Sequence, residues 1–163
     1  MLALYSIVAI LLTLIDQLSK WAVLQFVKPV NTIPLWKNVF HLTYCENRGA
    51  AFGILQNKFG LFFVITVLVV VVVTAYIIKK RPQSRCLTLS LALLVGGALG
   101  NFIDRLFRGF VVDFLDFRLI NFAIFNFADC CVVCGACLLA FYVLFLDKKP
   151  EEKDETNDES DDE

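Results

Sequence analysis

Two aspartates lie in strongly apolar stretches of the sequence and could act together as an acid and a base. Asp113 stands in VVDF (residues 111–114), and Asp129 ends FNFAD (residues 125–129). A carboxylate in or near hydrocarbon is costly, so a residue of this kind marks a functional site by default. Two carboxyls at one site cannot both ionise cheaply, which separates their proton affinities. The pair therefore predicts the chemistry of an aspartic protease.

Other acids and one amide bear on this pairing. Asn126 lies three residues before Asp129, on the same helical turn, and could donate a hydrogen bond to a carboxylate. Asp104 and Asp116 are near in sequence and compete as partners. Residue types alone therefore do not identify the two members of the pair.

Two further groups of polar residues flank the apolar segments. Asp16 and Lys20 are four residues apart, so they share one face of a helix. They either pair with each other and shape the helix end, or contact the aspartate pair or a substrate head group. In GGALG (residues 96–100), two glycines on one helix face favour close packing of a neighbouring helix. Asn101 and Arg105 follow, and Arg105 could either hold the next loop or position a substrate.

The elements that must position these residues are membrane-spanning. Of 163 residues, 58% are hydrophobic and the mean hydropathy is +0.70. Residues 61–78 contain no charge, and a stretch of that length predicts a transmembrane helix. Four such spans are expected, at residues 2–24, 59–78, 86–102 and 128–146. The first of them is interpreted as an uncleaved anchor.

The connections predict how the spans are arranged. The turn at residues 79–85 is short and basic, whereas residues 25–58 and 103–127 form long connections on the opposite side. The long connections are rich in aromatic and β-branched residues, which predicts short strands that form an apolar cradle at the membrane surface. His41, in one of them, is assigned no catalytic role. The density of positive charge favours a cytoplasmic position for the basic turn and both termini, whereas a raw count of charges does not, so charge alone leaves the orientation open.

The last thirteen residues differ in composition from the rest. Residues 151–163 carry nine acids and one lysine, whereas the preceding 150 residues have a net charge of +7. A polar, acidic segment without aromatic residues predicts a disordered tail. We therefore expect a four-helix membrane domain at residues 1–150 and an acidic cytoplasmic tail at residues 151–163.

The cysteines are interpreted as small buried apolar residues. Cys130, Cys131, Cys134 and Cys137 fall on one predicted helix, and thiolates on a single helix cannot surround a tetrahedral metal ion. Cys45 and Cys86 are too far apart in the expected topology to form a disulfide. No metal site is predicted.

Five motifs together resemble bacterial lipoprotein signal peptidase, also called signal peptidase II. They are DQLSK, ENRGAAF, GGALGNFIDR, VVDF and FNFAD, in that family's order, at residues 16–20, 46–52, 96–105, 111–114 and 125–129. The resemblance implies an α-helical integral membrane protein with four transmembrane helices, a small β-cradle and a short surface helix on the outer face. It further implies an aspartic endopeptidase without a cofactor, which removes the signal peptide of a prolipoprotein before its diacylglyceryl-modified cysteine.

By position, the resemblance implies that Asp113 and Asp129 are catalytic. Substrate-binding residues would be Asn47, Asn101, Arg105, Asn126, Asp16 and Lys20. The expected location is the bacterial inner membrane, with the active site at its outer face. Expected partners are prolipoproteins, membrane lipids and the inhibitor globomycin, but not nucleic acid.

Two other functions remain open from the residues. A small proton-coupled transporter could also use buried acids, although here they cluster toward one face of the membrane. Metal-dependent phosphotransfer on a lipid would require several carboxylates that converge on magnesium.

Overall fold

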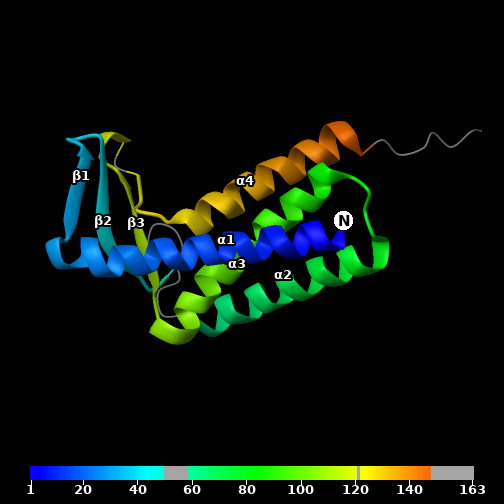
Figure 1. Cartoon of the computed structure of the whole chain (residues 1–163), viewed down its shortest axis with the longest axis horizontal. Coiled ribbons are helices and arrows are strands. Elements are labelled where there is room, and N and C mark those ends of the chain that lie inside the picture. Colours follow the sequence, from blue (N-terminus) through cyan, green and yellow to red (C-terminus); the bar gives the residue numbers. More distant parts are fainter. Residues whose placement is uncertain (50–58, 121, 148–163) are drawn as a thin grey trace, which may run out of the picture.

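The computed structural model describes residues 1–49, 59–120 and 122–147, and four long helices dominate it. They are α1 (Leu2–Ala22), α2 (Phe59–Lys80), α3 (Arg85–Arg108) and α4 (Phe127–Phe141). Figure 1 shows the helices running lengthwise, with a small sheet standing at one end and the α2–α3 turn at the other. The N-terminus lies at the end with the turn, as expected if the long connections lie on the opposite side. The acidic tail lies outside the described residues.

Local sequence signals explain where the helices begin and end. Pro82 follows α2, and Ser84 caps the start of α3, where its side chain accepts a hydrogen bond from the Leu87 amide. Gly109 ends α3 in a left-handed conformation with φ of 77°. Beyond its regular part, α1 continues through a π-helical turn (Val23–Val27) and a 3-10 turn (Lys28–Val30).

One boundary predicted from the sequence was wrong. The third span was expected to end near residue 102, but α3 continues to Arg108. Asp104 and Arg105 therefore lie on a helix rather than in the following loop. The reason is that Asp104 is fully buried among partners, so a polar residue there does not end the helix. Asp113 lies on a strand in the connection after α3, where short strands were expected.

The sheet has three antiparallel strands in the order β1-β2-β3. They are β1 (Thr32–Trp36), β2 (Phe40–Asn47) and β3 (Val111–Phe117), and a 3-10 turn (Arg118–Ile120) follows β3. Val112 and Phe114 of β3 pack on Val23 and Val27 at the end of the first span. This confirms the expected strands, and it places Asp113 of β3 against the helix ends.

Glycines allow the helices to approach closely, as the sequence predicted. A methyl group at Gly96 would lie 3.1 Å from the Ala9 carbonyl oxygen of α1. At Gly100, it would lie 2.5 Å from the carboxyl of Asp16. α3 is thus the central helix, and it packs on α1 and α4 with almost no space between the backbones.

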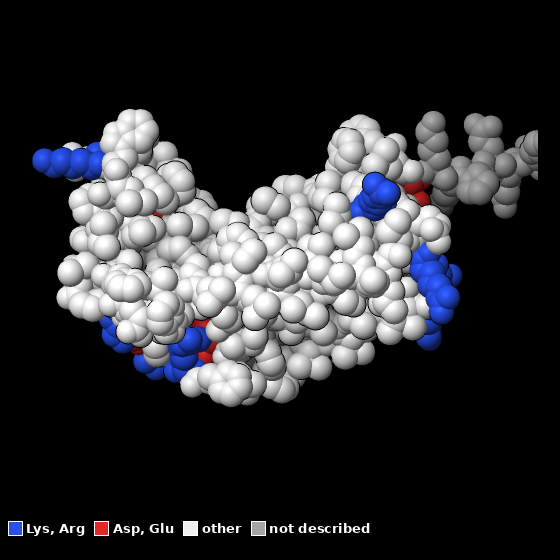
Figure 2. Space-filling view, viewed as in Figure 1, with Lys and Arg blue, Asp and Glu red and all other residues white. Residues whose placement is uncertain are grey.

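The outer surface suits a bilayer. All four helical segments are long and apolar enough to cross a membrane: Leu2–Val30, Gly60–Lys80, Arg85–Arg108 and Phe127–Leu146. Figure 2 shows lysines and arginines gathered at the two ends of this face, with an uncharged surface between them. The expected fold, a four-helix integral membrane protein with a small antiparallel sheet, is confirmed.

Candidate active site

The two predicted catalytic aspartates come together where the sheet meets the helices. Asp113 projects from β3, and Asp129 lies in the first turn of α4. Asn126 donates from Nδ2 to Asp113 Oδ1 at 2.6 Å, and Asn101 donates from Nδ2 to Asp129 Oδ1 at 2.7 Å. Asn126 Nδ2 also lies 3.1 Å from Asn101 Oδ1. Two neighbouring amides therefore link the two carboxyls.

Burial gives Asp113 an unusual proton affinity. Asp113 is buried, with only 2% of its surface exposed. Burial, and after it the negative charge of Asp129, raises the pKa of Asp113 to about 7, although hydrogen bonds from Asn47 and Asn126 act in the opposite direction. Asn47 Nδ2 donates to Asp113 Oδ2 at 2.9 Å. Asp113 can therefore carry or release a proton near neutral pH.

Asp129 also has a structural contact, which fixes its position. Asn126 is the N-cap of α4, and its side-chain oxygen accepts from the Asp129 amide at 3.0 Å. In return, Asp129 Oδ2 accepts from the Asn126 amide at 3.1 Å. This capping box locks the first turn of the helix. It leaves Asp129 Oδ1 as the oxygen that faces Asn101.

A buried ion cluster lies directly behind the amides. Lys20 is fully buried, and its ammonium lies 2.9 Å from Asp16 and 3.2 Å from Asp104. It also donates to Asn101 Oδ1 at 2.9 Å. The sequence left open whether Asp16 and Lys20 pair with each other or reach toward the aspartate pair. The structure shows the ion pair, and it connects Lys20 to Asp129 through Asn101.

The acids of this cluster fasten separate segments to one another. Asp16 accepts a hydrogen bond from the Ala128 amide at 3.0 Å, which ties α1 to the start of α4. Asp104 accepts from the Val112 amide at 2.9 Å and pairs with Arg108, so it ties α3 to β3. Arg108 was not singled out by sequence reasoning, although its position one turn after Asp104 on a helix would have indicated it.

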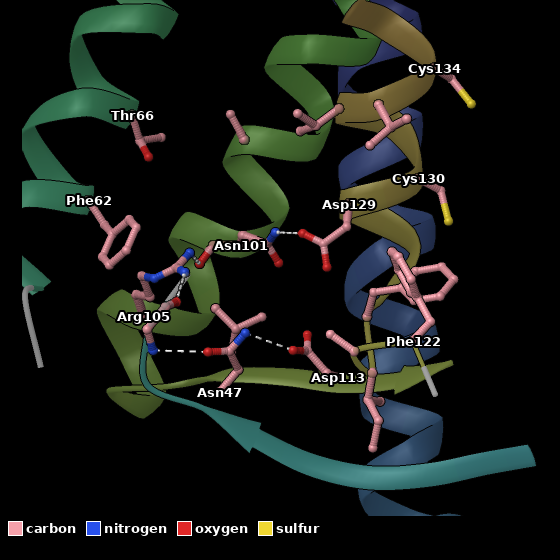
Figure 3. A pocket seen from close by; sticks show the side chains of 18 residues that line it. Asn47, Phe62, Thr66, Asn101, Arg105, Asp113, Phe122, Asp129, Cys130 and Cys134 are labelled. Atoms are coloured by element: carbon pink, nitrogen blue, oxygen red, sulfur yellow. Dashed lines mark hydrogen bonds between the residues drawn. The ribbon is translucent and has the colours of Figure 1, made fainter. Parts of the chain in front are cut away.

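A pocket of about 650 Å³ opens beside the two aspartates. Figure 3 shows Asn47, Asn101, Asp113 and Asp129 around it, with Phe62 on the opposite wall. Most of the remaining lining is apolar: Val111, Phe122, Ala123, Ile124, Phe125, Val132 and Val133. A pocket with a few convergent polar groups in apolar walls is the usual form of a binding site.

Arg105 lines this pocket on the wall that also contains Phe62. Its guanidinium donates to the Gly49 carbonyl oxygen at 2.9 Å and lies 4.4 Å from the centre of the Phe62 ring. Of the predicted site residues, Asn47, Asn101, Arg105, Asp113 and Asp129 line the pocket. Asp16, Lys20 and Asn126 are buried behind the lining.

The competing acids lie elsewhere. Asp116 accepts from Thr43 at 2.6 Å and from Arg118 at 2.9 Å, on the part of the sheet away from the pocket. His41 is buried in the same region and contacts Thr32 and the Asn38 amide. The structure therefore singles out Asp113 and Asp129 as the pair that shares a pocket. In the described part of the chain, no three histidine, cysteine or acidic side chains are grouped to hold a metal ion.

Comparison with known proteins agrees with this geometry. Residues 8–145 match the family described as signal peptidase (SPase) II. The chain belongs to the signal peptidase II family. Those residues include both aspartates, the buried ion cluster, all of α2, α3 and α4, and most of α1.

Individual relatives support the assignment over nearly the whole chain. A protein of Clostridioides difficile (strain 630) named lipoprotein signal peptidase is 49% identical, over 90% of this chain and 98% of its own. One of the same name from Halothermothrix orenii is 50% identical, over 84% and 92%. A solved bacterial membrane enzyme has a TM-score of 0.82 and 31% identity, covering 93% of this chain and 95% of its own.

Proposed function

We propose that this membrane protein is an endopeptidase that removes signal peptides from prolipoproteins. Cleavage occurs before a diacylglyceryl-modified cysteine, through a water activated between Asp113 and Asp129. Membership of the signal peptidase II family supports the reaction. The observation that supports the mechanism is the pair of carboxyls linked through Asn126 and Asn101 at the wall of one pocket.

The pair supplies both an acid and a base. One aspartate, ionised, takes a proton from the attacking water, while its protonated partner donates a hydrogen bond to the scissile carbonyl. The roles reverse as the amine leaves. Since the two carboxyls interact, the single proton belongs to the pair rather than to one residue. A pKa of about 7 for Asp113 is consistent with one proton shared near neutral pH.

The other pocket residues suit the binding of a peptide. Asn47 and Arg105 present donors on the side of the pocket away from α4. The apolar wall suits the small apolar side chains of a signal peptide, and the acyl chains of the substrate stay in the bilayer. Asp16, Lys20 and Asn126 contribute by holding the polar groups in place.

The proposed topology places the sheet at the outer face of the bacterial inner membrane and both termini in the cytoplasm. It is supported by the position of the basic α2–α3 turn at the end opposite the sheet (Figure 1). Outer-leaflet lipids then surround the open side of the pocket. Globomycin, an inhibitor of this family, is expected to compete for the same pocket.

Cleavage by purified protein tests the proposal. A prolipoprotein carrying the diacylglyceryl group should be cut immediately before its cysteine, and the same chain without the lipid should not. Globomycin should stop the reaction, whereas a chelator should leave it unchanged. If the lipidated substrate remains uncut, the proposed function is wrong. A loss of activity with the chelator would instead favour metal-dependent chemistry.

A further inference from the structure

Two cysteines line the pocket and have no part in the proposed mechanism. Cys130 follows Asp129 on α4, and Cys134 lies one helical turn further. Both border the pocket, and both carry free thiols. Figure 3 shows the two sulfur atoms on the same side of α4, the side away from Asn101, with Phe122 near Cys130.

The other two cysteines of α4, Cys131 and Cys137, do not line the pocket. Cys131 is buried, and its Cβ would lie 3.1 Å from a methyl group at Gly97, so it faces α3. Cys137 is exposed but does not border the pocket. Adjacent residues of a helix do not face each other, whereas residues four apart do. Cys130 and Cys134 are therefore the one pair of α4 thiols that share both a helix face and the pocket.

Their spacing suits a bridged adduct better than a disulfide. The Cβ atoms of residues four apart on a helix lie about 5–6 Å from each other. A disulfide requires about 3.5–4.5 Å between Cβ atoms. A single larger atom bound to both sulfurs lengthens the bridge and removes this mismatch, so the helix need not distort.

We propose that Cys130 and Cys134 form a dithiol site for a trivalent arsenical that carries one organic group, and that its occupancy blocks the pocket. The site takes a soft electrophile that can accept two thiols. The surrounding wall of Phe122, Ile124 and Val133 favours an aryl group, and such compounds also enter a bilayer.

The reaction needs no oxidant or reductant. With phenylarsine oxide, the arsenic–oxygen bond is replaced by two arsenic–sulfur bonds, one to each cysteine. The two thiol protons leave with the oxygen as one water molecule, and arsenic remains trivalent. A small dithiol such as 2,3-dimercaptopropanol reverses the reaction by taking the arsenic onto its own sulfurs.

The adduct interferes with substrate because of where it lies. Cys130 is the neighbour of Asp129, and the pocket holds only about 650 Å³. An aryl group attached to the Cys130–Cys134 wall occupies the part of this volume lined by Phe122 and Val133, on the side of α4 away from Asn101. Because arsenic bonds only to the two thiols, the carboxyls of Asp113 and Asp129 remain unmodified.

The binding test uses intact full-length protein in detergent, with phenylarsine oxide as the probe. Mass spectrometry of the protein should show one phenylarsenic added, together with the loss of two thiols available to maleimide. Cys130→Ala and Cys134→Ala each leave only one of the two sulfurs, so arsenical affinity should fall by about 10²–10⁴-fold. Thermal stability of each variant checks that it is folded.

Cys137→Ala is the matched control, because Cys134 and Cys137 are the competing pair on the same helix. This variant should bind like the unmodified protein. If Cys137→Ala loses binding and Cys130→Ala keeps it, the proposed pair is wrong. Equal uptake by all of these variants would also overturn it.

The blocking step rests on the proposed function, so cleavage is measured separately from binding. Phenylarsine oxide should lower prolipoprotein cleavage at least tenfold, and dimercaptopropanol should restore it. The cleavage rate of each variant after treatment is compared with its own untreated rate. Cys130→Ala and Cys134→Ala should cleave at nearly their untreated rates. If arsenic binds both thiols and the cleavage rate does not fall, the proposal that the adduct blocks the pocket is wrong. Absence of cleavage before treatment counts against the proposed function and leaves the binding result intact.

Discussion

The ammonium of Lys20 lies 2.9 Å from Asn101 Oδ1, and this contact decides which end of the Asn101 amide faces Asp129. Because an ammonium only donates, the amide oxygen must point toward Lys20. The amide nitrogen is then left to donate to Asp129 at 2.7 Å. Lys20, which is buried behind the pocket, thus favours the orientation in which the Asn101 side chain donates a hydrogen bond to the carboxyl of Asp129.

This relationship predicts the effect of Lys20→Met. The variant should lower kcat more than it raises KM, because Asn101 keeps only Asn126 as a donor to its side-chain oxygen and is oriented less firmly. It also leaves Asp16 and Asp104 buried without their shared cation, which should cost about 3–5 kcal/mol of stability. The measurements are cleavage kinetics and thermal unfolding in detergent.

Lys28→Met is the matched control for that experiment. Lys28 is half exposed and lies 4.0 Å from Glu46, so its loss should cost less than about 1 kcal/mol. A Lys20→Met protein with normal kcat would show that Asn101 is held by other contacts.

Removal of either carboxyl should stop the reaction. Asp113→Asn and Asp129→Asn each delete one ionisable member of the pair, so cleavage should fall by at least about 10²–10⁴-fold while the protein remains inserted. Asp116→Asn should keep most of its activity, because Asp116 contacts Thr43 and Arg118 instead. Substantial turnover by either of the first two variants would move the catalytic assignment to another acid.

The raised pKa of Asp113 predicts how cleavage depends on pH. The pair works with one shared proton, and since the pKa of Asp113 is raised to about 7, the pair loses this proton above about pH 7. Cleavage should therefore decline as the pH rises through about 7, as measured by initial rates with the lipidated substrate. A rate that stays constant from pH 6 to 9 would contradict this titration.

The same titration should appear in stability. Between the ordinary value of 3.8 and about 7, the folded protein keeps a proton on Asp113 that the unfolded chain has released. The protonated Asp113 therefore contributes its full stabilisation of the folded protein below about pH 4. This contribution, on the order of 4 kcal/mol, is lost as the pH rises to about 7. Asp113→Asn should lack this loss, so the difference in Tm between the two proteins should change over that range.

Close helix packing predicts that Gly100→Ala is damaging. The added methyl would lie 2.5 Å from Asp16 Oδ2 and 3.2 Å from Ala128 Cβ, so the buried ion cluster must shift. We expect a loss of about 1–3 kcal/mol and reduced cleavage. Gly60→Ala is the control, since nothing lies within 4 Å of its new methyl. Thermal unfolding of both variants decides whether the effect is specific to the α1–α3 contact.

The acidic tail should be dispensable for cleavage. A chain ending at Pro150 loses nine acids and one lysine, on the side of the membrane proposed to be opposite the site. Salt screens charges beyond about 8–10 Å, and the bilayer core is about 30 Å thick. Truncated and full-length proteins should therefore cleave at equal rates when compared at equal membrane levels. A large decrease would show that the tail acts on the site or that the topology is inverted.

The sequence by itself determined the four helical spans, the strands, and the two aspartates as candidates. Hydropathy and helix breakers are local, so residues 61–78 and Pro82 could be interpreted without knowledge of the fold. The family motifs added the expected roles. The end of α3 was placed too early, because sequence alone could not show that Asp104 is fully buried beside Lys20 and Arg108.

Only the tertiary structure decided which polar groups meet. Asp113 has Asp104 and Asp116 as nearer acids in sequence, yet it shares the pocket with Asp129, which is 16 residues away. The pairing depends on the backbone hydrogen bonds from β3 to Phe125, just before α4, and on the side chains of Asn126 and Asn101 that link the two carboxyls. Such contacts join distant segments, so their geometry, and with it the raised pKa of Asp113, arises only when the helices and the sheet pack together.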